Sequence, residues 1–472
     1  MKQNKQFFIF LGLHVALWSL LPILLRSNLP MDSAEALVWG FVGEWGTPKH
    51  PPLSGWLANM MYQITQAPAS LYVLSQLCIA GGFVYVYRLA KEIFSADKAL
   101  AASIILEGVA YYNLVTPEYN VNVVAMMLWP AVTYYFYKGQ KENRLIDWIL
   151  FGVFAGLNIL NKYVSGVLLL ALGLYLLFTK QGRTSLKSWK LYAGAIVAFA
   201  LILPHVWWLY QHDWFVLNYF LSRSGNGKVL PFGLGHIVYP LKFVGGQILL
   251  LVAPLLVLAT CRKKAPEKTT VPSKDRAFVF YAGVLPLLIM GGLSLLTGLK
   301  LKSMWGSPTL YLFGLVFMTY FPFHVHKLKW LIWGVGYVFM GLYALIFIGM
   351  MCCSTSAKYG LNAKDLTQAL GTEKYDYVGG SVWLASTLSV YASHHPQVLF
   401  FMEPKQNPWI NMEDVKQKGI LVVEEELSTY QWHQEKIKNL PEPKIYDLVI
   451  KTQFGKEVHY PLYYGEIVGD QK

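Results

Sequence analysis

The chain has 472 residues, of which 55% are hydrophobic and only 14% are charged, and its mean hydropathy is +0.38. Soluble domains carry roughly 25% charged residues, so this composition excludes an ordinary soluble protein and indicates a membrane protein. The net charge of +13 is no sign of nucleic-acid binding here, because half of the basic residues lie in short loops between apolar segments. Basic residues in such loops determine membrane topology.

Eleven apolar segments are each long enough to cross a bilayer if tilt is allowed. The first resembles a signal peptide but has no small-residue cleavage site before Arg26, so we expect it to remain as a membrane anchor. The fifth and sixth are separated only by Asn161, Lys162 and Tyr163, and they are either two short spans or one long broken span. The predicted spans are residues 7–25, 70–90, 99–115, 121–137, 147–161, 164–178, 191–209, 237–259, 277–297, 304–322 and 330–350.

The distribution of Lys and Arg over the loops predicts the orientation. Loops on the side of the N-terminus contain 20 of these residues, and loops on the opposite side, without the C-terminal segment, contain 8. The positive-inside rule therefore places the N-terminus in the cytoplasm. We expect a multi-pass protein of the bacterial inner membrane, with the loop 26–69 on the periplasmic side.

An odd number of spans also places the C-terminal segment outside the cytoplasm. We divide the chain into a membrane domain, residues 1–352, and a small extracytoplasmic α/β domain, residues 353–472. In the second domain SVWLASTLSVYA has helical apolar spacing, while VLFFM and GILVVE are typical of strands. The segments YDLVIKTQF and EVHYPLYYGEIV predict a closing antiparallel pair.

The first outer loop contains two acidic residues at helical spacing, in MDSAEALVWGFVGEW. On a helix that begins near Asp32, the side chains of Asp32, Glu35 and Trp39 lie on one face. One interpretation is a capping box, in which Asp and Glu satisfy the amides at a helix N-terminus. The other is a pair of carboxylates in an active site.

A rigid turn follows these acids. Proline disfavours helical geometry in the preceding residue, so His50 is expected to be extended, and Pro52 is well placed to begin a new helix. That helix has an uncharged apolar stripe, which predicts a position in the membrane interface. The stripe consists of Leu53, Trp56, Leu57, Met60, Met61 and Ile64. The loop 26–69 thus predicts two surface helices joined by an elbow that carries Lys49 and His50.

The motifs D-x-x-E-x-x-x-W at 32–39 and K-H-P-P-L at 49–53 resemble the first outer loop of polyprenyl-phosphate-dependent glycosyltransferases. These enzymes form part of the GT-C superfamily, with the protein O-mannosyltransferases and the aminoarabinose transferase of lipid A. TPEYN at 116–120, LNILNKY at 157–163 and LKSMWGSP at 301–308 add to the resemblance, which covers most of residues 1–350. It implies an acidic pair in the active site, a polyprenyl-phosphate sugar donor such as an undecaprenyl phosphate, and inversion at the anomeric carbon. Many relatives have adjacent Asp and Glu, whereas here the two are three residues apart.

Glycosyl transfer from a lipid phosphate needs a base for the acceptor's proton and cations for the leaving phosphate. We assign Asp32 as the base, and Glu35 as a group that orients the acceptor or holds a metal. The candidate phosphate ligands are Lys49, His50, Lys162 and Lys302. Lys162 has an alternative role as a lysine that snorkels from a span end, and Lys302 as an interfacial residue.

Three further residues are candidates for acceptor binding or for support of the site, namely Glu118, Asn120 and Arg223. For Glu118 a helix-capping role is equally compatible with the sequence, and Arg223 lies in a glycine-rich loop that needs no function. Glu107 falls inside the third span, where an ionisable group must be paired or functional, but the sequence names no partner.

A divalent metal is a possible cofactor, held by a carboxylate with His50, His205, His212 or His236. The spacing of these histidines is unlike that of compact metal sites, so the metal ligands are unknown. No nucleotide-binding fingerprint is present, as expected for a lipid-linked donor.

We predict a glycosyltransferase that moves one sugar, a hexose or a pentose, from a polyprenyl phosphate to lipid A or to the lipopolysaccharide core. The first alternative is a protein hydroxyl as the acceptor. A transporter or flippase of lipid-linked sugars is a second, but it predicts charged groups at the bilayer midplane. A non-enzymatic envelope assembly factor is a third, and it would tolerate loss of the Asp32 carboxylate.

Overall fold

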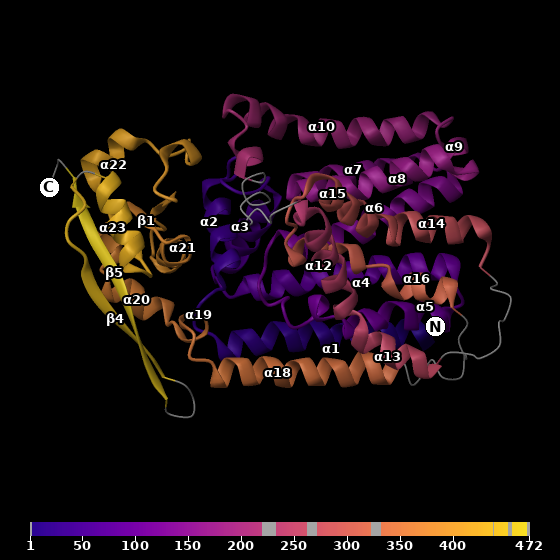
Figure 1. The fold of residues 1–472 in the computed structure, drawn as a ribbon, viewed down its shortest axis with the longest axis horizontal. Helices are drawn as coiled ribbons and strands as arrows, with labels where there is room; N and C mark the ends of the chain where they lie inside the picture. Colours follow the sequence, from indigo (N-terminus) through magenta and orange to yellow (C-terminus); the bar gives the residue numbers. More distant parts are fainter. Residues whose placement is uncertain are drawn as a thin grey trace.

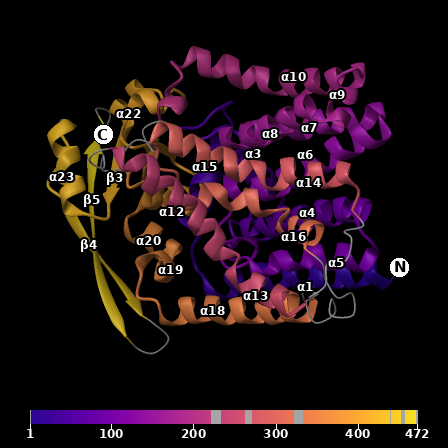
Figure 2. The same ribbon diagram turned by 45° about the vertical axis from the view of Figure 1, so that its right-hand side comes forward.

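In a computed structural model, helices run side by side in a bundle, and a β-sheet packs against one end of it (Figures 1 and 2). The N-terminus lies at the other end of the bundle. The structure describes residues 2–219, 233–261, 271–321, 332–437, 439–451 and 456–469. This mainly helical architecture with a small C-terminal sheet agrees with the fold class predicted from the sequence.

The bundle contains α-helices with short 3-10 segments and one π-helix between them. The α-helices are α1 (Lys2–Leu25), α2 (Met31–Val42), α3 (Leu53–Thr65), α4 (Ser70–Ile93), α5 (Ala96–Ile104), α6 (Val121–Glu142), α7 (Leu145–Asn161), α8 (Gly166–Phe178), α9 (Lys180–Ser185), α10 (Trp189–Gln211), α12 (Gly235–Leu250), α13 (Val252–Cys261), α14 (Ser273–Gly283), α15 (Leu285–Thr297), α16 (Phe313–Tyr320) and α18 (Phe339–Cys353). The other segments are η1 (Ile105–Gly108), η2 (Ala110–Tyr112), η3 (Tyr163–Ser165), η5 (Ser303–Leu310) and the π-helix η7 (Ile332–Val338).

Among the described residues, four helices are long and apolar enough to cross a membrane, namely α1, α4, α10 and η7 with α18. The number rises to six if each of two bent pairs is one span: α12 with α13, bent by 47°, and α14 with α15, bent by 43°. These helices coincide with predicted spans. The total of eleven stays a prediction, since several of the other segments are shorter helices.

Two predicted spans are not continuous helices. Residues 99–115 form the end of α5 followed by η1 and η2, and residues 304–322 begin with the 3-10 segment η5 before α16. In the first case Asn113 accounts for the irregular backbone, because its side-chain amide donates to the carbonyl of Glu107 at 2.6 Å. Apolar composition alone did not reveal this local hydrogen bond.

The chain reverses its direction at Lys162, which decides between two spans and one broken span. The end of α7 meets the start of α6, where the Asn161 amide donates to the carbonyl of Val121 at 2.7 Å. The end of α8 lies at the opposite end of α6, where Gln140 donates to the hydroxyl of Tyr175 at 2.6 Å. Helices α7 and α8 are therefore two antiparallel segments joined by a tight turn.

The partner of Glu107 is His14 of α1. The two side chains are fully buried, and the imidazole Nδ1 lies 2.8 Å from a carboxylate oxygen. A buried carboxylate without a partner is costly, so this contact explains why Glu107 is tolerated inside the bundle.

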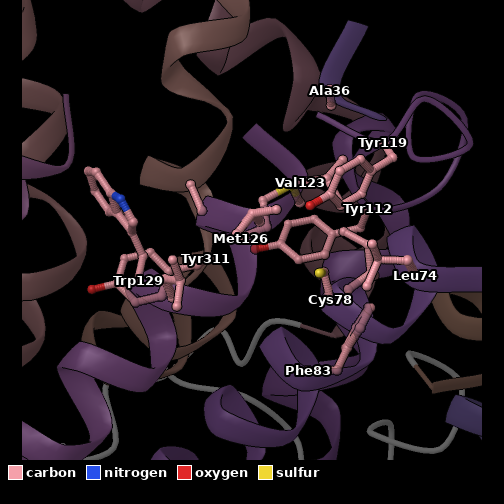
Figure 3. Close-up of a cluster of buried hydrophobic side chains, with 14 of the residues drawn as sticks. Ala36, Leu74, Cys78, Phe83, Tyr112, Tyr119, Val123, Met126, Trp129 and Tyr311 are labelled. Carbon is pink, nitrogen blue, oxygen red and sulfur yellow. The ribbon is translucent and has the colours of Figure 1, made fainter. Parts of the chain in front are cut away.

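The two helices predicted in the first outer loop are present as α2 and α3, and they cross at very short range. A Cβ atom on Gly40 would lie 2.2 Å from the carbonyl oxygen of Gly55, so only glycine fits at this crossing. Tyr119 holds α3 in place from the side of the bundle core, since its buried hydroxyl donates to the carbonyl of Ser54 at 2.8 Å. Figure 3 shows Tyr119 in the aromatic core beside Ala36 of α2.

The outward side of α3 carries apolar residues of the predicted stripe, with Met60 54% and Ile64 74% exposed. Its inward side consists mainly of Leu53, Ser54, Gly55, Ala58 and Tyr62. Exposed apolar side chains are what a helix in the membrane interface presents to lipid, and this location stays a prediction.

The C-terminal segment folds around a five-stranded sheet with strand order β2-β1-β3-β5-β4. Strand β1 pairs in parallel with β2 and β3, and β5 pairs antiparallel with β3 and β4. All four predicted strands and the predicted helix are present, while β1 was missed because YVGG is short and half glycine. The elements are α19 (Ala357–Gly360), α20 (Ala363–Ala369), η8 (Thr372–Lys374), β1 (Tyr377–Gly380), α21 (Val382–Tyr391), β2 (Gln397–Phe400), η9 (Pro404–Gln406), α22 (Met412–Lys418), β3 (Gly419–Glu424), α23 (Leu427–Lys436), β4 (Lys444–Lys451) and β5 (Glu457–Val468).

Helix α21 joins this sheet to the bundle, since it lies between the sheet and α2 (Figure 1). His395, which follows α21, stacks on the ring of Phe41 at 4.3 Å between ring centroids. Its Nε2 also lies 3.0 Å from the hydroxyl of Tyr62 in α3. The C-terminal segment thus holds both helices of the first outer loop.

We predict that Gly40→Ala lowers stability by about 1–3 kcal/mol, because the added methyl group forces α2 and α3 apart. Thermal unfolding of the purified protein in detergent measures this effect. Gly173→Ala in α8 is the matched control, since no atom lies within 4 Å of the added carbon, and it should be neutral or stabilising. Equal melting temperatures for the two variants would contradict the tight crossing.

Candidate active site

A cavity of about 440 Å³ lies between the first outer loop, the ends of several membrane helices and the C-terminal segment. It brings together eight of the nine residues that the sequence nominated. These are Asp32, Glu35, Lys49, His50, Glu118, Asn120, Lys162 and Lys302. The ninth, Arg223, lies outside the described residues.

The acidic pair is not a capping box. Helix α2 has Pro30 at its N-cap position and no side-chain hydrogen bond at the cap. An amide at the N-terminus of α2 is instead bound by Glu118, whose Oε1 accepts from the backbone amide of Asp32 at 3.3 Å. Glu118 thus contacts the N-terminus of α2, while Asn120 caps the helix that follows it in sequence, α6.

Glu35 pairs with Lys49 across the elbow. Their shortest nitrogen–oxygen distance is 2.6 Å, with side chains only 2% and 12% exposed. Burial lowers the pKa of Lys49, but the Glu35 carboxylate outweighs this effect, so the pKa is raised and the ammonium stays charged. The Lys49 ammonium also lies 5.4 Å from the centre of the Phe401 ring, which comes from the C-terminal segment.

Thr47 fixes the elbow that carries Lys49 and His50. Its hydroxyl donates to the carbonyl of His50 at 2.8 Å and accepts from the amide of His50 at 2.9 Å. The carbonyl of Trp45 lies 2.6 Å from Nδ1 of His205 in α10. The elbow is thus rigid before any substrate binds, which is what a preorganised site requires.

Lys162 is not a snorkelling lysine, because it is only 7% exposed and points into the cavity. Its ammonium donates to Oδ1 of Asn122 and lies 5.7 Å from the centre of the Trp305 ring. Burial lowers the pKa of Lys162 to about 7, against the opposing attraction of Asp32. An anion that enters the cavity would stabilise its charged form.

Glu118 faces Asp32, and the two carboxyl groups interact. Burial and the charge of Asp32 raise the pKa of Glu118 to about 7, because two neighbouring carboxyl groups resist carrying two negative charges. Asn120 accepts from the amides of Asn122 and Val123 at 2.8 and 3.3 Å, which caps α6. Asn120 therefore shapes the cavity wall through α6.

Sequence reasoning did not nominate several other residues that line the cavity, among them Arg26, Tyr219, Lys358, Tyr359 and Trp383. The last three come from the C-terminal segment, which carries no motif that pointed to chemistry. Only their position beside α2 and the end of α1 makes them part of the site.

The histidines do not form a metal site within the described part of the chain, where no group of three or more His, Cys, Asp or Glu residues has suitable geometry. His212 and His236 each lie 2.7 Å from a backbone carbonyl, of Trp208 and Leu295 respectively. Of the four nominated histidines, His50 lines the cavity.

The chain is similar in sequence and in fold to several known proteins. A family model described as dolichyl-phosphate-mannose-protein mannosyltransferase matches residues 49–208. The lipopolysaccharide core galacturonosyltransferase RgtB of Rhizobium johnstonii is 24% identical over 304 residues, which are 61% of this chain and 60% of RgtB. RgtA of the same organism is 23% identical over 224 residues, covering 46% and 45%. The chain therefore spans less than two thirds of the length of either relative.

The fold is that of ArnT from Cupriavidus metallidurans. The structure of ArnT bound to undecaprenyl phosphate matches with a TM-score of 0.61 at 12% identity, over 98% of each chain. The apo structure matches with a TM-score of 0.53 at 13% identity, over 100% of this chain and 99% of ArnT. In its fold and in the motifs of its first outer loop, the chain resembles membrane glycosyltransferases of the GT-C type. Within that class, the chain resembles ArnT over its whole length and RgtB over part of it.

We predict that Glu35→Ala destabilises the protein by about 3–5 kcal/mol, because it leaves the Lys49 ammonium buried without its partner. Unfolding by denaturant in detergent measures this loss. The double variant Glu35→Ala/Lys49→Met should recover most of it, because no uncompensated charge is left. If the double variant is no more stable than Glu35→Ala, the ion pair does not account for the loss.

We also predict that binding of a polyprenyl phosphodiester weakens by about tenfold between pH 6 and pH 8. The lowered pKa of Lys162 means that its charge is lost over this range, while Glu118 gains negative charge. Both changes oppose anion binding. A phosphodiester probe is chosen because its own charge is constant.

Affinity measured by fluorescence quenching at each pH provides the test. Lys162→Arg should flatten the profile because arginine stays charged, and Glu118→Gln should remove the remaining slope. An affinity that rises with pH, or a slope unchanged in both variants, would contradict the assignment.

Proposed function

We propose that the chain transfers a single sugar from a polyprenyl-phosphate donor to lipid A or the lipopolysaccharide core on the extracytoplasmic side of the bacterial inner membrane. The observation that carries this proposal is one cavity in which the Asp32 carboxylate faces buried lysines from two other segments. The similarity to RgtB and RgtA, both named for the lipopolysaccharide core, supports the acceptor class. The ArnT-like fold supports a lipid-linked donor.

The chemistry follows from the charges in the cavity. A hydroxyl oxygen of the acceptor attacks the anomeric carbon, and the bond from this carbon to the donor phosphate oxygen breaks. Asp32 takes the hydroxyl proton. The polyprenyl phosphate leaves with one additional negative charge, which Lys49, Lys162 and Lys302 stabilise. Attack from the face opposite the phosphate inverts the anomeric configuration.

Neighbouring groups position these residues. Glu35 holds the Lys49 ammonium at 2.6 Å, so that the lysine remains charged and directed into the cavity. Glu118 fixes the N-terminus of α2 next to Asp32. His50 donates to the phosphate from the elbow, and Asn120 supports the acceptor side. Arg223 stays a candidate for acceptor binding from the sequence alone.

The proposed topology has eleven spans, with the N-terminus in the cytoplasm and residues 353–472 outside it. The C-terminal sheet and the N-terminus lie at opposite ends of the bundle, as an odd number of spans requires (Figure 1). In this arrangement α2 and α3 lie in the outer interface.

A protein hydroxyl is the second candidate acceptor, because the matching family model is described as a protein mannosyltransferase. A flippase of lipid-linked sugars is less well supported, since the charged cavity residues gather at one end of the bundle and not at its middle.

We predict that Asp32→Asn lowers the turnover of sugar transfer by 100-fold or more, about 2.7 kcal/mol of barrier at least, because the amide cannot accept the proton. Mass spectrometry of envelope glycolipids, from cells with and without the gene, identifies the added sugar and its carrier. A uronic acid is the first donor sugar to assay, given the names of the two curated relatives.

Asp365→Asn is a matched control, because Asp365 is exposed in α20 and does not line the cavity. The amount of Asp32→Asn protein in the membrane must equal that of the wild type, so that the loss of transfer does not reflect poor expression. Undiminished transfer by Asp32→Asn would rule out Asp32 as the base, and an envelope assembly factor would then explain the chain better.

A further inference from the structure

The cationic side chains of the cavity outnumber its carboxylates. Among its described lining residues, five are cationic and three are carboxylates. The Lys49–Glu35 contact is the ion pair that the structure gives for this set. The cations are Arg26, Lys49, Lys162, Lys302 and Lys358, and the carboxylates are Asp32, Glu35 and Glu118.

The cations fall into two groups by their place in the fold. Lys49, Lys162 and Lys302 come from loops at the ends of membrane-domain helices. Arg26 also follows a membrane-domain helix, α1, but its guanidinium donates to the carbonyl of Lys358. Lys358 belongs to α19, which lies between the end of α18 and the sheet (Figures 1 and 2). The phosphate of a polyprenyl donor must stay near the bilayer that holds its chain, so the first group suits the donor. The second group has no such assignment.

Arg26 and Lys358 are held together without a carboxylate partner in the described structure. The Arg26 guanidinium donates to the carbonyl of Lys358 at 2.8 Å and to Oδ1 of Asn28 at 3.2 Å, both neutral acceptors. It lies 5.3 Å from the centre of the Tyr359 ring, and its buried Nε has no hydrogen-bond partner. The Lys358 side chain is exposed.

Two carboxyl groups interact with these cations at longer range, Glu118 with both of them and Glu425 with Lys358. Burial and Asp32 raise the pKa of Glu118 to about 7 against the pull of Arg26 and Lys358. Its Oε1 is also engaged by the amide of Asp32. An arginine held in place with one unpaired donor, next to an exposed lysine, is an arrangement that binds carboxylates and phosphates.

We propose that Arg26 and Lys358 form a second anion-binding subsite, which takes the carboxylate or phosphate substituent of a bound saccharide. The subsite is distinct from the lysines that face the donor phosphate, and it gives the C-terminal segment a direct part in choosing the substrate. This inference rests on the proposed sugar transfer. The anionic substituent is carried either by the donor sugar or by the acceptor.

Two substrate series distinguish these sources. The donor series compares polyprenyl-phosphate galacturonic acid with polyprenyl-phosphate galactose, which lacks the carboxylate. The acceptor series compares a phosphorylated core glycolipid with the same lipid after removal of its phosphates. Transfer by the wild-type protein with at least one pair is the test of the proposed function itself.

Lys358→Gln and Arg26→Gln should each lower kcat/KM for the charged member of one series by about tenfold or more. The uncharged member should change by less than threefold. Lys358→Arg, which keeps the charge, should retain most of the activity. Lys364→Gln is the control, because this exposed lysine of α20 does not line the cavity.

A loss confined to the donor series assigns the substituent to the donor sugar, and a loss confined to the acceptor series assigns it to the acceptor. Equal losses for charged and uncharged members, or no loss in either series, would overturn the proposal. Binding of the charged and uncharged acceptors to the purified protein, measured without donor, separates a folding defect from a lost contact. If the transfer assays assign the substituent to the acceptor, the variants should lose the preference for the charged lipid in this binding assay, and if they assign it to the donor sugar, the variants should bind both acceptors like the wild type.

Discussion

The ion pair between Glu35 and Lys49 connects the two halves of the first outer loop, and the rest of the site depends on it. It joins α2 to the elbow at 2.6 Å, in surroundings where neither charge is tolerated alone. The Gly40–Gly55 crossing brings α3 close enough to complete this unit, and Thr47 gives the elbow one shape. The loop 26–69 is therefore held in one shape by its own contacts. Its elbow carries Lys49, and its helix α2 presents Asp32 to the cavity. A loop without these contacts would have to order itself each time a donor bound.

Much of this loop could be predicted from the sequence, because its signals are local. The spacing of Asp32 and Glu35 predicted one helical face, and the two prolines predicted the elbow and the start of α3. The functions of single residues were harder to predict, since they depend on partners far along the chain. Glu118 contacts the N-terminus of α2 from 86 residues away, and Glu107 meets His14 across 93 residues. For Lys162 the sequence left a phosphate ligand and a snorkelling lysine as alternatives, and only the reversal of the chain places it beside Asn122 and Trp305.

The C-terminal segment shows the limit of sequence reasoning more clearly. Its helix α21 and strands β2 to β5 were evident from periodicity, yet none of its cavity residues was nominated. The packing of α19 against the end of α1, and of α21 against α2, is what brings three residues of this segment into the cavity wall, namely Lys358, Tyr359 and Trp383. The contacts of His395 with Phe41 and Tyr62 hold this arrangement in place. The segment is thus a wall of the cavity, and its contribution to function follows from tertiary structure.

The central claim is that one preorganised cavity receives a lipid phosphate beside the Asp32 carboxylate. An experimental structure of the protein with bound undecaprenyl phosphate tests this claim most directly. We expect the phosphate oxygens within hydrogen-bonding distance of the ammonium groups of Lys49 and Lys162, with the elbow unchanged and the polyprenyl chain directed into the bilayer. A phosphate bound away from these lysines, or an elbow that unfolds to admit the lipid, would contradict the account.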